Sequence, residues 1–164
     1  MIKLIILDVD GCMTDGNIVY SNSDDELKSF HVQDGLGIVS WIKLGGQIAI
    51  ITGRESKIVA RRAKELGIKH LYQNIGDKYA VMRNIMQQLD IGVEETAAIG
   101  DDLNDYNMLL NAYRSFTPAN GTAPIKEIVD TVLVSKGGGG AIREMIDILI
   151  DENHQYRAFV DLWR

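Results

Sequence analysis

The chain alternates short apolar runs with longer amphipathic segments. Three runs are strongly apolar, at residues 2–8, 47–51 and 96–99, and three weaker ones lie at 69–72, 114–117 and 131–134. Continuously apolar runs suit strands that are covered on both faces, as they are in parallel sheets. The first prediction is therefore a set of strands buried in the middle of the molecule.

Segments with helical spacing separate these runs. They lie at residues 35–44, 55–66, 77–89, 103–111 and 141–150. Gly45 and Gly67 are typical stop residues for the first two, and Asp77 is a plausible N-cap for the third. Strands that alternate with helices indicate βαβ units. The pattern predicts an α/β fold, a Rossmann-like three-layer sandwich with a central parallel sheet.

Two segments depart from this rhythm. Within residues 15–32, the runs 18–20 and 27–32 flank a polar stretch, which predicts a β-hairpin inserted after the first strand. The insert is too short for a separate lid, so we expect no cap domain. At the other end, the tail at about 153–164 contains Tyr156, Phe159 and Trp163. Because this tail is apolar, we expect it to pack against a protein surface, either on its own subunit or on a neighbouring subunit.

Composition narrows the range of functions. The 164 residues favour a single domain spanning 1–164, and the net charge of −6 lacks the basic footprint of nucleic-acid binding. An acidic surface also disfavours binding to anionic membranes, and the apolar N-terminal run is too short to span one. The single cysteine, Cys12, permits no internal disulfide and fits a reducing compartment. We therefore expect a cytoplasmic protein.

Acidic residues follow the first strand. Asp8 and Asp10 are two positions apart, so on an extended strand their carboxylates would point to the same side. Close carboxylates repel unless a cation joins them, and Mg²⁺ is the hard ion that prefers oxygen ligands. Acids and glycine are also common turn residues, so this pair by itself fits a capped turn equally well.

Other predicted strand ends carry complementary groups. Thr52 and Gly53 follow the second strong run and could hold phosphate oxygens through a hydroxyl and a backbone N–H. A lone lysine at a helix start, here Lys78, is usually solvated. The third strong run ends in an acidic cluster that contains Asp101, Asp102 and Asp105.

Together these pieces resemble the four motifs of the haloacid dehalogenase superfamily of phosphatases. The matching stretches are Asp8-x-Asp10-Gly11-x-x-Thr14, Thr52-Gly53, Lys78 and Gly100-Asp101-Asp102-x-x-Asp105. The resemblance implies that Asp8 is the nucleophile and Asp10 the general acid and base. It implies that Asp8, the backbone carbonyl of Asp10, and Asp101 bind Mg²⁺, and that Thr52 and Lys78 hold the phosphate. Asp102 and Asp105 would orient the metal shell and Lys78.

Further stretches resemble one capless branch, the 3-deoxy-D-manno-octulosonate 8-phosphate phosphatases. They are Asp15-Gly16, the segment 30–38, the segment 52–68 and the segment 136–144. The resemblance implies a homotetramer in lipopolysaccharide inner-core synthesis, whose substrate is a small sugar-acid phosphate. Gly53, Arg54, Arg62 and Arg143 are candidates for binding that substrate. Arg54 and Arg62 are eight residues apart, about two helical turns, and would share a face; Arg143 could instead pack against the tail.

Two alternatives remain open, a related sugar-acid phosphatase and a non-catalytic domain, whereas the motif order disfavours a third, a receiver module. A sister branch acts on ketodeoxynonulosonate 9-phosphate, or on the related N-acylneuraminate 9-phosphate, but it tends to carry an acid where this chain has Arg54. A receiver module would need its phosphate-accepting aspartate on a middle strand, in a different motif order. A non-catalytic oligomerisation domain of the same fold would be expected to lack one of the aspartates or Lys78.

Without a cap, water exclusion must come from elsewhere, most simply from another subunit.

Overall fold

A computed structural model describes all 164 residues. Its central sheet has six parallel strands in the order β5-β4-β1-β6-β7-β8. Their bounds are β1 (Leu4–Leu7), β4 (Gln47–Ile51), β5 (His70–Tyr72), β6 (Thr96–Ile99), β7 (Arg114–Thr117) and β8 (Thr131–Val132). Leu7 of β1 lies opposite both Ile50 and Ile99, so three strands end side by side at the centre of the sheet. All six predicted strands are confirmed.

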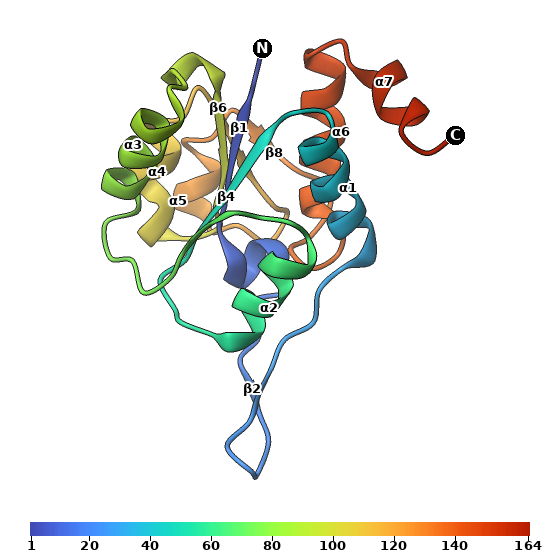
Figure 1. The fold of residues 1–164 in the computed structure, drawn as a ribbon. Helices are drawn as coiled ribbons and strands as arrows, with labels where there is room; N and C mark the ends of the chain where they lie inside the picture. The colour runs from blue at the N-terminus through green and yellow to red at the C-terminus, as the bar shows by residue number, and fades with distance from the viewer.

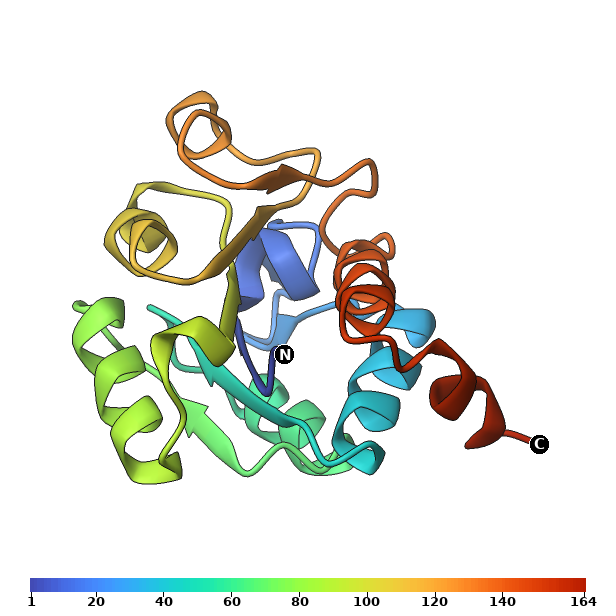
Figure 2. The same ribbon diagram turned by 90° about the horizontal axis from the view of Figure 1, so that it is seen from above.

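Helices cover both faces of this sheet (Figures 1 and 2). One face carries α1 (Val32–Lys43), α2 (Lys57–Glu65) and α6 (Ala141–Glu152), and the other carries α3 (Lys78–Leu89), α4 (Tyr106–Leu110) and α5 (Ala123–Lys126). Successive side chains of a strand point to opposite faces. Ile5 and Leu7 accordingly join the first hydrophobic cluster, whereas Leu4 and Ile6 join the second. The predicted three-layer sandwich is confirmed.

The predicted hairpin insert is present but short. It pairs β2 (Val19–Tyr20) with β3 (Glu26–Leu27) in antiparallel fashion and projects from the body of the molecule (Figure 1). The expectation of a second arm reaching residue 32 is wrong, because Val32 already begins α1. Gly35 lies inside this helix, and Arg62 packs against it: a Cβ at this position would lie 2.5 Å from the guanidinium. No cap domain accompanies the hairpin.

The tail folds back onto its own chain. It contains a further helix, α7 (Tyr156–Asp161), whose Phe159 joins the hydrophobic core. Beyond this helix, the indole N–H of Trp163 donates a hydrogen bond to Ser40 Oγ at 3.1 Å, and Lys43 Nζ lies 4.0 Å from the indole ring. Of the two docking alternatives, the structure has the tail on α1 and α6.

None of the helices has both the length and the apolar character that a membrane span requires.

Candidate active site

The loop after β1 forms the floor of the site. Asp8 follows the strand directly, is 4% exposed and donates its backbone N–H to Ile99 O at 3.2 Å. Residues Val9–Met13 then form the wide turn η1, in which Gly11 has a φ of +93°. A Cβ on Gly11 would lie 2.0 Å from Asp101 Oδ2, so only glycine lets this turn approach Asp101.

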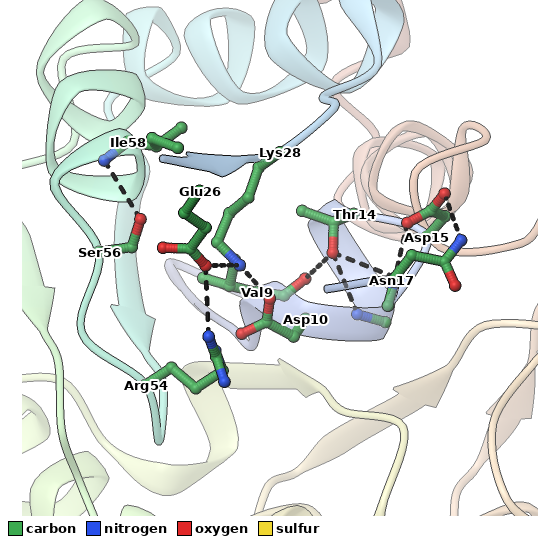
Figure 3. Close-up of polar contacts among 12 residues, drawn as sticks. Val9, Asp10, Thr14, Asp15, Asn17, Glu26, Lys28, Arg54, Ser56 and Ile58 are labelled. Atoms are coloured by element: carbon green, nitrogen blue, oxygen red, sulfur yellow. Dashed lines mark hydrogen bonds and ion pairs between the residues drawn. The ribbon is translucent and has the colours of Figure 1, made fainter. Parts of the chain in front are cut away.

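This turn corrects one expectation about the acid pair. Asp8 and Asp10 do not share a strand, because β1 ends at Leu7 and the chain turns at once. The Asp10 carboxylate instead faces the hairpin, where its Oδ1 accepts a hydrogen bond from Lys28 Nζ at 2.5 Å (Figure 3). The two carboxylates are therefore held by different partners.

Lys78 is buried, not solvated. Its Nζ donates to Asp8 Oδ1 at 2.6 Å and to Asp105 Oδ1 at 2.5 Å, and the residue is 2% exposed. Asp77 fixes the start of α3 by accepting a hydrogen bond from Ala80 N at 3.0 Å. A lone lysine at a helix start is usually solvated, but here the helix begins at the sheet edge, where buried acids need a cation. The structure thus places Lys78 beside Asp105, as the motif resemblance implies.

The acids around Lys78 form a site that fits Mg²⁺. Oxygens of Asp8 and Asp101 and the sulfur of Cys12 all lie within 4.8 Å of one another. Burial, together with the negative charge of Asp105, raises the pKa of Asp8 to about 8 and that of Asp101 to about 6. Asp8, Asp101 and Asp105 carry three negative charges when ionised and Lys78 only one positive charge, so a divalent cation would stabilise the ionised carboxylates. Carboxylate oxygens are the ligands that Mg²⁺ prefers.

Cys12 does not change this preference. Burial and the neighbouring Asp8 raise the pKa of the Cys12 thiol well above its ordinary value. The thiol therefore stays protonated, and a protonated thiol is a poor metal ligand. The oxygen donors decide which ion the site suits.

Thr52 and Gly53 lie at the same sheet edge. They follow β4, which pairs with β1, and Thr52 is 2% exposed. A Cβ built on Gly53 would lie 3.8 Å from Asn104 Nδ2 in the loop after β6. The loops after β1, β4 and β6 thus converge, as the motif order requires.

Asp102 and Asp105 have different positions in the loop after β6. This loop begins with the single turn η3 (Leu103–Asp105), so the predicted helix at 103–111 is divided between η3 and α4. Asp102 is exposed and caps η3 by accepting a hydrogen bond from Leu103 N at 2.8 Å. Asp105 is fully buried, and besides Lys78 it accepts a hydrogen bond from Asp101 N at 3.0 Å. Asp105 therefore ties Lys78 to the loop that carries Asp101, whereas contact of Asp102 with a metal shell stays a prediction.

The predicted substrate-binding arginines do not share a helix face. Arg54 lies in the loop before α2, and its Nη2 is 3.3 Å from Glu26 Oε1 on the hairpin (Figure 3). The same nitrogen is 3.4 Å from the hydroxyl of Tyr20, also on the hairpin. The helix begins only at Lys57, so the argument from helical spacing is wrong. Arg62 lies on α2, with its guanidinium 5.6 Å from the centre of the Phe30 ring.

Arg143 packs against the tail. Its Nε is 2.8 Å from Asp147 Oδ1, and its guanidinium lies 5.4 Å from the Phe159 ring centre. These contacts match the tail-packing alternative. A role for Arg143 in substrate binding stays a prediction.

Two residues of the site escaped sequence reasoning. Lys28 is one, because nothing in a short hairpin arm predicts that its ammonium is buried against Asp10. Asn120 is the other: its Nδ2 donates to Gly11 O at 2.9 Å and its Oδ1 accepts from Gly137 N at 2.7 Å. A Cβ on Gly137 would lie 1.9 Å from Gly11 O, so the glycine-rich segment 137–140 packs directly against the η1 turn. Only the turn residues around Asn120 hint at this in the sequence.

Comparison with known proteins gives consistent matches. Residues 70–146 match the family model of the haloacid dehalogenase-like hydrolases. The chain is 39% identical over 158 residues to 3-deoxy-D-manno-octulosonate 8-phosphate phosphatase KdsC of Haemophilus influenzae, covering 96% of this chain and 88% of that protein.

Solved structures of such phosphatases superimpose closely on the chain. The enzyme from Moraxella catarrhalis, in complex with magnesium, phosphate and KDO, has a TM-score of 0.96 at 38% identity, covering 99% of this chain and 94% of that one. The cobalt-bound phosphatase from Haemophilus influenzae has a TM-score of 0.88 at 40% identity, covering 92% of this chain and 88% of that one.

Proposed function

Because the chain belongs to the 3-deoxy-D-manno-octulosonate 8-phosphate phosphatase family of haloacid dehalogenase-like hydrolases, we propose that it hydrolyses KDO 8-phosphate to KDO and inorganic phosphate. The observation that carries the proposal is the buried bridge from Asp8 through Lys78 to Asp105, beside Asp101. The KDO released in this way would enter lipopolysaccharide inner-core synthesis.

Asp8 is the nucleophile in this proposal. One carboxylate oxygen attacks phosphorus, the bond from phosphorus to the sugar oxygen breaks, and an aspartyl-phosphate forms. Asp10 gives its proton to the departing alkoxide. In the second step Asp10 takes a proton from water, whose oxygen attacks phosphorus and releases inorganic phosphate and the Asp8 carboxylate. The turn after β1 supports this division of work, because it gives the two carboxylates different partners.

Mg²⁺ is the cofactor, held by Asp8, the backbone carbonyl of Asp10, and Asp101. When bound, it offsets the repulsion between carboxylate and phosphate and stabilises the charge that develops on the phosphoryl oxygens. Asp105 and Asp102 support this site from behind, the former through its hydrogen bond from the backbone of Asp101.

Thr52, the backbone N–H of Gly53 and Lys78 hold the phosphoryl oxygens. Charge stabilisation by fixed donors is the main task in phosphoryl transfer, since the protein contributes little other chemistry. The 2% exposure of Thr52 and Lys78 supports this, because donors in a water-poor site act more strongly.

Arginines recognise the sugar acid. Arg54, on the open side of the site and 43% exposed, is the first candidate for the substrate carboxylate, with Arg62 and Arg143 as further candidates. A guanidinium matches the planar carboxylate with two parallel hydrogen bonds. An arginine after Thr52-Gly53 also favours the eight-carbon substrate over the nine-carbon sugar acids of the sister branch.

Replacement of the nucleophile tests the reaction. Asp8→Asn should abolish Mg²⁺-dependent release of phosphate from KDO 8-phosphate while the circular dichroism spectrum stays unchanged. A panel with nonulosonate 9-phosphates should give the highest kcat/KM for KDO 8-phosphate. Full activity of Asp8→Asn, or preference for a nine-carbon substrate, would contradict the respective part of the proposal.

The assembly proposed for this cytoplasmic enzyme is a homotetramer whose hairpins lie around the symmetry axis. Ile18, Val19, Tyr20 and Leu27 on the projecting hairpin are each at least 40% exposed, which leaves an apolar surface that a neighbouring subunit would cover. Such contacts would also close the site in place of the missing cap. Sedimentation of the wild type should give a tetramer, and a double change of Tyr20→Ser with Leu27→Ser should give smaller species; a monomeric wild type would refute the assembly.

A further inference from the structure

Lys28 is a buried cation that none of the family motifs includes. It follows β3 of the hairpin, and its side chain is 2% exposed. Its Nζ lies 2.5 Å from Asp10 Oδ1 and 3.2 Å from Glu26 Oε1 (Figure 3). Burying an ammonium is costly unless carboxylates surround it, so these contacts determine where the lysine can lie.

This lysine restrains only one side of the Asp10 carboxylate. Oδ1 accepts the hydrogen bond from Lys28, whereas no protein hydrogen bond engages Oδ2. The Asp10 side chain is 20% exposed, so it retains access to the open side of the site. A carboxyl group anchored by one oxygen keeps the other free to give or accept a proton.

The anchor belongs to a chain of alternating charges. It runs from Asp10 through Lys28 and Glu26 to Arg54, and so connects the loop after β1, the hairpin and the loop after β4. Because each charge has an opposite neighbour, the hairpin is held against the site. The hairpin therefore contributes a fixed contact to the chemistry as well as an exposed surface.

We propose that Lys28 is the positioning residue for Asp10, holding its carboxyl group where it can protonate the leaving oxygen. This inference rests on the proposed function, in which Asp10 is the general acid. The consequence is specific: a sugar alkoxide is a poor leaving group that needs the proton, whereas p-nitrophenolate is a good one that leaves without it.

The test compares kcat/KM for KDO 8-phosphate and p-nitrophenyl phosphate. For each substrate, kcat/KM reports only the steps up to departure of the leaving group. Hydrolysis of the aspartyl-phosphate therefore does not affect it. Lys28→Met should lower kcat/KM roughly 10- to 100-fold for KDO 8-phosphate, and by less than about threefold for p-nitrophenyl phosphate. Lys28→Arg keeps a cation beside Asp10 and should recover most of the loss.

One control separates positioning from structure. Lys3 forms a 2.5 Å ion pair with Glu95 at the opposite end of β1, and Lys3→Met should leave kcat/KM unchanged for both substrates. If Lys28→Met does not fold, Lys28→Gln allows the same comparison of kcat/KM on the two substrates. Any decrease in kcat/KM that remains in Lys28→Arg should affect KDO 8-phosphate and not p-nitrophenyl phosphate.

The outcomes distinguish this inference from the reaction on which it rests. Asp10→Asn, like Lys28→Met, should lower kcat/KM more for KDO 8-phosphate than for p-nitrophenyl phosphate. The decrease for KDO 8-phosphate should be larger in Asp10→Asn than in Lys28→Met. Equal losses on both substrates for Asp10→Asn would refute its role as general acid. A selective Asp10→Asn beside an unselective Lys28→Met would overturn the positioning role alone.

Discussion

Removal of divalent cations should make the protein less stable as the pH rises. Asp8 is 4% exposed and lies among further carboxylates, with Lys78 as the ammonium that bridges it to Asp105. Without a metal ion, ionisation of Asp8 places an additional negative charge in this buried cluster. EDTA is therefore the perturbation, and the free energy of unfolding is the quantity to follow.

The magnitude follows from the pKa of Asp8. Burial and the charge of Asp105 raise this pKa from 3.8 to about 8. Between these values the folded protein holds a proton that the unfolded chain has lost, so stability decreases with rising pH. One such group changes the free energy of unfolding by about 1.4 kcal/mol per pH unit. Asp101, with a pKa raised to about 6, acts in the same direction, but its partial exposure screens the effect.

Thermal melts in EDTA between about pH 5.5 and about pH 7.5 measure this slope. A loss of about 3 kcal/mol over that range corresponds to a fall in Tm of roughly 6–12 °C for a domain of this size. Asp8→Asn is the matched control, because its amide does not titrate and the histidines contribute equally to both proteins. The wild type should lose the extra slope when Mg²⁺ is present in excess. A slope that is equal in Asp8→Asn, or a wild-type Tm that rises with pH in EDTA, would refute the reasoning.

Three further predictions concern the site and the tail. Lys78→Met leaves two buried carboxylates without their cation, so it should abolish turnover and cost about 3–5 kcal/mol in urea unfolding; a change below about 1 kcal/mol would contradict the burial argument. Gly11→Ala places a Cβ 2.0 Å from Asp101 Oδ2 and should weaken Mg²⁺ binding by calorimetry, whereas Gly16→Ala, with a similar φ of +86° but no such clash, should cost stability alone. Trp163→Ala removes a hydrogen bond and a cation–π contact that are together worth about 1–2 kcal/mol. Limited proteolysis should therefore cleave the tail faster in this variant than in the wild type. Equal cleavage rates would show that other contacts hold the tail.

The sequence was sufficient to predict the architecture and the order of the site residues along the sheet edge. Runs such as 47–51 and 96–99 are continuously apolar, and a strand covered on both faces has few other ways to bury such residues. Parallel strands end at one edge, so residues that follow them must lie near one another. For this reason the sequence alone predicts that Asp8, Thr52 and Asp101 lie together.

The partners of individual charges could not be predicted in the same way. Lys28 follows a two-residue strand, and that pattern is typical of a solvated lysine. Lys78 begins a helix, and only the motif resemblance, not its local pattern, placed it beside Asp105. The spacing of Arg54 and Arg62 suggested one helix face, yet the helix begins after Arg54. In each case the deciding contact joins segments far apart in the chain, such as the 70 positions between Lys78 and Asp8.

The local pattern of apolar and polar residues thus determined which segments are strands and helices, which faces are buried and which ends carry chemistry. Only the tertiary structure decided that one lysine bridges the buried acids while another, from the hairpin, holds Asp10. The physical reason is that burial of apolar surface depends on periodicity within a segment, whereas the energy of a buried charge depends on distances between segments, and these exist only after the chain has folded.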